Sequence, residues 1–107
     1  MKYAQVIDVR TNKETRELGL LFDPTELNIL CDALRQWKAK HKWKQNKQLD
    51  PVWLKANHLT APAWFFVDCK VAIAIHDAIK EYCTAHSKSK HAAALDKSFD
   101  NVPYCYM

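Results

Sequence analysis

The chain has 107 residues, of which 49% are hydrophobic and 26% are charged, and its formal net charge is +4. This length and composition predict one folded domain, residues 1–107, with one modest core, and they exclude a disordered chain. The single glycine, Gly19, argues against a β-sandwich or barrel, whose tight turns need several residues at positive φ. It also argues against a glycine-rich phosphate-binding loop.

Charged side chains interrupt the longest apolar stretch of the sequence, so no membrane-spanning segment and no membrane partner are predicted. The first ten residues lack the apolar run that a signal peptide needs, and we therefore expect a cytoplasmic protein. In that reducing compartment, widely spaced cysteines without C-x-x-C spacing are expected to be buried free thiols. They are Cys31, Cys69, Cys83 and Cys105.

The N-terminal residues 2–22 predict an antiparallel β-hairpin. Residues 2–10 are rich in β-branched and aromatic side chains, and residues 15–22 alternate polar and apolar positions. The segment TNKE between them supplies turn-forming residues. Because an isolated hairpin is only marginally stable, it needs helices to pack against.

The rest of the chain predicts helices. Asp23, Pro24 and Glu26 form a helix-start pattern, and apolar residues at three- and four-residue spacing continue the helix over residues 24–44. Asp50–Pro51 predicts a short helix over 51–58, and Thr60 with Pro62 predicts a long helix over 61–87. The C-terminal segment, 88–107, contains a short helical stretch and an aromatic end that we expect to dock on the domain or on a partner.

Together these elements predict an α+β fold, with an N-terminal antiparallel β-hairpin packed on two long antiparallel α-helices. A short helix lies between the two long helices, and a C-terminal segment docks on them. On the predicted helix 61–87, three apolar residues fall outside the main apolar face: Phe66, Cys69 and Ile73. The C-terminal segment or a second copy of the chain would cover them, so self-association into a homodimer is one expectation.

Positive charge is concentrated between Arg35 and Lys55, where seven basic residues face one acidic residue for a local charge of +6, while the remainder sums to −2. Tryptophans within this region add interface-forming side chains. The predicted partner-binding residues are Arg35, Lys38, Lys42, Trp43, Lys44, Lys47, Trp53 and Lys55. Trp43 and Trp53 beside the lysines resemble anchors within a surface for an acidic protein.

The same lysines and tryptophans leave nucleic acid as the alternative partner, because phosphate binding needs clustered cations and single strands stack on aromatic rings. The helical wheel weakens this alternative, since Trp37 faces the core and several lysines scatter around the helix. No helix-turn-helix, RNA-recognition or zinc-finger pattern surrounds the cluster.

Catalytic and metal-binding patterns are weak. Cys69 with His76 and Cys83 with His86 have spacings that would place each pair on one helix face, but no oxyanion loop or acidic pair accompanies them. Cys83, His86 and His91 would supply three ligands of a zinc site that lacks a fourth. We therefore expect no enzyme, no cofactor and no metal site.

The sequence thus predicts a small non-enzymatic protein-binding module acting as a regulator, adaptor or inhibitor. Compact virus-encoded modulators of host proteins share this general style, so a viral origin is an additional expectation.

Overall fold

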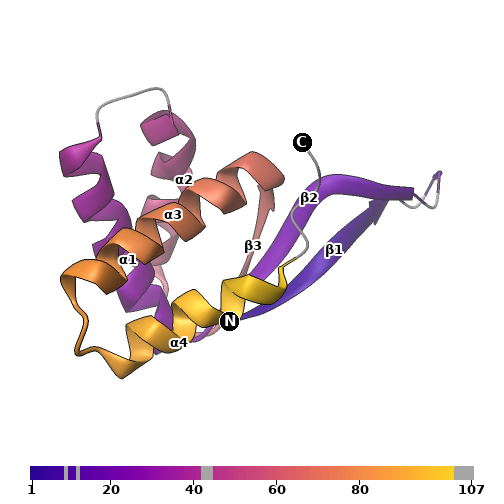
Figure 1. Cartoon of the computed structure of the whole chain (residues 1–107). Helices are drawn as coiled ribbons and strands as arrows, with labels where there is room; N and C mark the ends of the chain where they lie inside the picture. Colours follow the sequence, from indigo (N-terminus) through magenta and orange to yellow (C-terminus); the bar gives the residue numbers. More distant parts are fainter. Residues whose placement is uncertain (9, 12, 42–44, 103–107) are drawn as a thin grey trace.

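The computed structural model describes residues 1–8, 10–11, 13–41 and 45–102, and it confirms the predicted α+β class (Figure 1). A three-stranded antiparallel sheet of order β1–β2–β3 lies against the helices. The strands are β1 (Lys2–Asp8), β2 (Lys13–Phe22) and β3 (Ala63–Asp68). The helices are α1 (Pro24–Lys40), α2 (Gln45–His58), α3 (Cys69–Ala85), α4 (Lys90–Ser98) and the 3₁₀ turn η1 (Phe99–Asn101).

The predicted hairpin is present as β1 and β2. Alternation along β2 buries Leu18, Leu20 and Phe22 completely, as expected of a strand with one face on the core. Strand β2 is the central strand of the sheet, because Leu20 lies opposite Tyr3 of β1 on one side and opposite Phe65 of β3 on the other.

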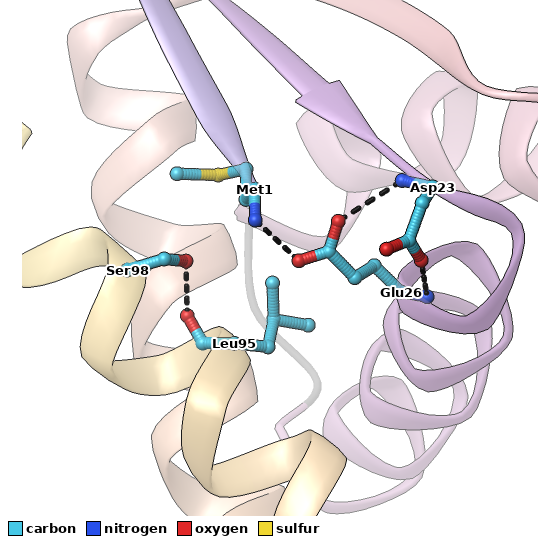
Figure 2. Close-up of polar contacts among 5 residues, drawn as sticks. All are labelled: Met1, Asp23, Glu26, Leu95 and Ser98. Atoms are coloured by element: carbon cyan, nitrogen blue, oxygen red, sulfur yellow. Dashed lines mark hydrogen bonds and ion pairs between the residues drawn. The ribbon is translucent and has the colours of Figure 1, made fainter.

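Helix α1 begins where its sequence predicts. The Asp23 carboxylate accepts a hydrogen bond from the Glu26 backbone nitrogen, and the Glu26 carboxylate accepts one from the Asp23 backbone nitrogen (Figure 2). The second Glu26 oxygen accepts from the backbone nitrogen of Met1, which holds the start of β1 against α1. The helix ends at Lys40 and is capped by His41 in an extended conformation, so the predicted end at 44 is too late; residues 42–44 lie outside the described residues.

The predicted helix over 61–87 is wrong in its first part, where residues 63–68 form β3. Four consecutive aromatic and β-branched residues, 64–67, favour a strand, and pairing with β2 satisfies the backbone of both strands. Helix α3 begins only at Cys69, where the Asp68 carboxylate caps it by accepting from the Lys70 backbone nitrogen.

The predicted short helix over 51–58 is also wrong in its start, because α2 begins at Gln45 and contains Pro51 in its interior. Proline costs a helix about 3 kcal/mol when it removes an internal hydrogen bond. Burial of Leu49, Val52 and Ala56, at three- and four-residue spacing, offsets this cost by packing one face of α2 on the domain. Asp50 therefore does not start a helix but pairs with Lys38 of α1.

One core joins the sheet to the helices. Phe22 of β2 contacts Phe65 edge to face, with ring centroids 5.5 Å apart, and lies 6.4 Å from Phe99 of η1. The C-terminal segment docks, as expected, through buried residues of α4, η1 and the residue that follows: Leu95, Phe99 and Val102. Ser98 at the end of α4 donates to the Leu95 carbonyl (Figure 2). Residues 103–107 of the predicted docking segment lie outside the described residues.

The capping box generates the first prediction. Asp23→Ala removes the acceptor for the Glu26 nitrogen and should lower the free energy of unfolding by about 1 kcal/mol, measured by urea denaturation. Asp77→Ala is the matched control, because Asp77 is an exposed aspartate on α3, and this variant should leave the midpoint almost unchanged. Equal losses for the two variants would show that the box contributes nothing of its own.

Candidate interaction surface

The residues predicted to bind a partner lie on two helices. Arg35 and Lys38 belong to the last turns of α1, and Lys47, Trp53 and Lys55 belong to α2. The remaining three, Lys42, Trp43 and Lys44, lie outside the described residues. The structure therefore divides the predicted patch between α1 and α2.

The α1 part of the patch is engaged inside the domain. Arg35 pairs with Asp32, with 2.8 Å between Nη2 and Oδ1. The Lys38 ammonium pairs with the Asp50 carboxylate and lies 5.5 Å from the centre of the Trp53 ring. Trp53 is itself half-buried against the core. Lys38 thus holds α1 and α2 together through Asp50 and Trp53, whereas the Arg35–Asp32 pair lies within α1. Both cations already have a carboxylate partner inside the domain.

The end of α1 is tied to α3 in the same way. Lys40 Nζ lies 3.1 Å from one Glu81 oxygen, and His41 Nε2 lies 3.0 Å from the other. The His41 ring also packs on the Trp37 indole, with centroids 3.9 Å apart. The hydrogen bond from Lys40 is the main cause that lowers the pKa of Glu81 below its ordinary value, and the bond from His41 adds to it.

The outer stripe of α2 remains open to solvent. We define this stripe by four exposed residues at four-, three- and four-residue spacing, which places them along one helix face: Lys47, Pro51, Leu54 and His58. Leu54 keeps 50% of its surface exposed. Asp50, the one carboxylate in the α2 sequence, is neutralised by Lys38. The stripe is therefore an apolar centre with the Lys47 cation at one end and the His58 imidazole at the other.

A groove of about 300 Å³ connects α2 to the sheet. Its apolar lining comes from Pro51 and Val52 of α2 and from the strand β3, including Phe65 and Phe66. Lys55 borders it, because its ammonium donates to the Trp64 carbonyl and lies 4.6 Å from the centre of the Phe65 ring. Lys55 thereby covers part of the outer edge of β3, a common way to protect an edge strand.

The residues predicted for self-association do not share one exposed surface. Phe66 projects from β3 with 62% of its surface exposed, whereas Cys69 at the start of α3 is buried with 3% exposed and Ile73 is half-buried. Trp64 of β3, which was not among the residues predicted for self-association, is 38% exposed beside Phe66. Exposed and buried residues alternate along β3. A strand assigned to this segment would have predicted that Trp64 and Phe66 lie on one exposed face, but the segment was predicted to be helical.

The cysteine and histidine pairs are used structurally. The Cys83 thiol donates to the Ala92 carbonyl at 3.0 Å, and burial raises its pKa. His76 Nε2 lies 3.1 Å from Asp96 Oδ1 and thus links α3 to α4. His86 stacks on Tyr82, with ring centroids 4.2 Å apart. Within residues 1–8, 10–11, 13–41 and 45–102, no cluster of histidine, cysteine and carboxylate side chains could hold a metal ion.

Comparison with known proteins finds no matching family model, no significant relative among curated proteins and no similar solved structure. No helix in the described ranges has the length and hydropathy needed to cross a membrane.

The Lys40–Glu81–His41 cluster generates a pH prediction. Because the pKa of folded Glu81 is lowered, the ionised carboxylate stabilises the fold at pH values above its ordinary pKa of 4.5. That stabilisation is lost as the pH falls through the lowered value. Glu81→Gln should therefore reduce the thermal unfolding temperature at pH 7. Its difference from wild type should shrink as the pH falls below 4.5 and vanish only in acid below the lowered pKa of folded Glu81.

The control for this prediction is Asp77→Asn, which removes an exposed carboxylate from the same helix. It should not reproduce the pH-dependent difference. A Glu81→Gln difference that persists unchanged into strong acid would mean that the Glu81 charge does not stabilise the fold.

Proposed function

We propose that the chain is a non-enzymatic protein-binding module, acting as a regulator, adaptor or inhibitor, and that its partner presents an acidic surface to the outer stripe of α2. The observation that carries the proposal is Leu54, half-exposed on a helix face between Lys47 and His58. An exposed leucine is ordinary by itself. On this helix, however, it lies on the same face as the Lys47 cation, and the one carboxylate of the helix, Asp50, is paired with Lys38.

The surface around Leu54 has the two properties that a specific contact needs. Burial of a fully exposed leucine side chain supplies about 1.5–3 kcal/mol of apolar stabilisation, and a partner that covers the half-exposed Leu54 would gain about half of that. Lys47 and Lys55 would meet carboxylates at the rim, where opposite charges accelerate association and select the partner. The groove beside Pro51 and Phe66 offers a second apolar contact for the same partner.

Nucleic acid remains the alternative, with less support. The Trp53 ring is half-buried and covered on one side by Lys38, so it is poorly placed for base stacking. Arg35, Lys38 and Lys40 each pair with a carboxylate of the domain. A phosphate would have to displace these carboxylates before it could use the α1 charges.

Two further parts of the proposal rest on the thiols. Burial raises the pKa of Cys31 and of Cys83, which makes both poor nucleophiles at neutral pH and supports a non-enzymatic role. No disulfide joins the described cysteines, Cys31, Cys69 and Cys83. Free thiols are typical of a reducing compartment such as the cytoplasm. A viral origin stays a prediction.

The test uses defined probes. An amphipathic peptide of alternating glutamate and leucine should bind the wild-type chain in a fluorescence anisotropy titration, because glutamates can face the lysines and a leucine can cover Leu54. A lysine-for-glutamate version of the peptide should not bind. Leu54→Asp should weaken binding of the acidic peptide by about tenfold or more, as loss of a central anchor does. Lys47→Glu and Lys55→Glu should each weaken binding of the acidic peptide by several-fold.

The matched control is the double variant Lys88→Glu/Lys90→Glu, which changes two exposed lysines before and at the start of α4 and should leave binding unchanged. A single-stranded oligonucleotide in the same titration tests the alternative. Tight, salt-sensitive oligonucleotide binding that survives Leu54→Asp, together with no peptide binding, would reject the protein-binding proposal in favour of nucleic acid.

A further inference from the structure

The outer face of the sheet is the second surface that the fold leaves uncovered. Leu18, Leu20 and Phe22 of β2 and Phe65 and Val67 of β3 point into the core. The alternating positions therefore point to the opposite face. The strand register arranges that face in cross-strand rows, of which one is Lys2–Leu21–Trp64 and the next is Ala4–Gly19–Phe66. Figure 1 shows β1 and β2 extending to the right, beyond the helices grouped on the left.

The centre of this face is apolar and flat. The Trp64 and Phe66 rings stack at an interplanar angle of 16°, with centroids 6.2 Å apart, and both are exposed. They lie over Gly19, because a Cβ placed there would be only 3.1 Å from Phe66 Cε1 and 3.2 Å from Trp64 Cε3. The absence of a side chain at Gly19 thus lets two aromatic rings rest on the neighbouring strand.

An apolar centre is unusual for this position. The solvent face of an antiparallel sheet normally carries polar residues, and apolar patches on a surface commonly mark a contact with another molecule. Leu21 and Ala4 extend the patch on the same side as Trp64 and Phe66. A partner for this patch has to offer an apolar surface that can cover the two stacked rings.

The charges at the two ends of the face are opposite in sign. One end of the face is the Lys2–Leu21–Trp64 row, where Lys2 supplies a positive charge. The Lys55 ammonium lies at the same end, beside β3, where it donates to the Trp64 carbonyl. At the other end, Glu17 of β2 lies directly opposite Asp68 of β3, and both are exposed. An acidic partner would be repelled at that second end, and a basic partner at the first.

We infer that the outer face of the sheet binds the same face of a second copy of the chain. The two-fold axis lies between the two sheets and runs across the strands, along the Ala4–Gly19–Phe66 row. It therefore places the cationic end of each copy against the Glu17–Asp68 end of the other. The two Phe66 rings then meet near the axis. This is the self-complementary contact that two-fold symmetry requires, in a sheet-on-sheet packing of ordinary spacing.

The inference goes beyond the proposed binding of an acidic partner, because it uses the sheet and not the outer stripe of α2. It also corrects the sequence-based expectation of self-association. Phe66 keeps its predicted place in the contact, whereas Trp64, Leu21 and Lys2 take the places that Cys69 and Ile73 were expected to hold.

Sedimentation equilibrium of the full chain tests the inference over roughly 1 μM to 1 mM, the range in which modest interfaces dissociate. We expect a concentration-dependent mass that rises from the 12.4 kDa of one chain towards twice that value. Phe66→Lys places two like charges near the axis and should raise the dissociation constant of the dimer at least tenfold. Because Phe66 is exposed, circular dichroism should show an unchanged fold.

Two charge variants test the arrangement itself. Lys2→Glu and Glu17→Lys should each weaken the dimer by several-fold, and the double variant Lys2→Glu/Glu17→Lys should recover most of the loss, because it exchanges the signs of the two ends. Tyr3→Lys is the matched control, since Tyr3 is exposed but lies opposite Leu20 and so points to the other side of the sheet; it should leave the dimer unchanged.

A chain that stays monomeric throughout the concentration range, or a dimer that is insensitive to Phe66→Lys, overturns the inference. A dimer that is lost with Phe66→Lys but not recovered in the double charge variant overturns the two-fold arrangement. Leu54→Asp separates this result from the proposed function, because it should weaken binding of the acidic peptide by about tenfold or more while leaving the dimer unchanged.

Discussion

The structure depends on strand β2, which pairs with a neighbour along both edges and buries every inward side chain between Leu18 and Phe22. A small sheet needs another layer of structure packed on its apolar face to be stable, and here helices cover that face. Helices α1 and α3 and the turn η1 supply that cover. The constraint leaves the opposite face open, and the aromatic pair on β3 is exposed for that reason.

The parts of the fold that were predictable from the sequence are those stabilised by local interactions. The capping box at Asp23 and Glu26 joins residues three positions apart, so its pattern is visible in the sequence and is present in the structure. Strand β3 is stabilised by pairing with residues more than forty positions away, and no local pattern records that pairing. Pro51 inside α2 shows the same limit, because packing of Leu49 and Val52 outweighs a local signal.

The candidate site was predictable to a similar extent. The concentration of lysines in the sequence directed attention to α1 and α2, where the structure places the described residues of the predicted patch. However, the carboxylates that neutralise them come from separate elements: Asp32 in α1, Asp50 in α2 and Glu81 in α3. Charge counted along the chain therefore overstates the charge that a partner would meet. Leu54 was overlooked because exposure of one leucine on an amphipathic helix depends on which face the rest of the domain covers.

The two surfaces differ in the kind of partner that they can accept, and this difference links the two proposals. The stripe on α2 carries one sign of charge around a single leucine and thus favours a partner of opposite charge. The sheet face carries both signs at opposite ends and thus favours its own copy. A dimer joined through the sheet would present two α2 stripes. When one partner contacts both stripes of the dimer, the effective concentration for the second contact reaches the millimolar range, provided that the linker between the two binding segments of the partner spans both stripes. A partner with repeated acidic segments would then bind the dimer far more tightly than a single stripe could hold it.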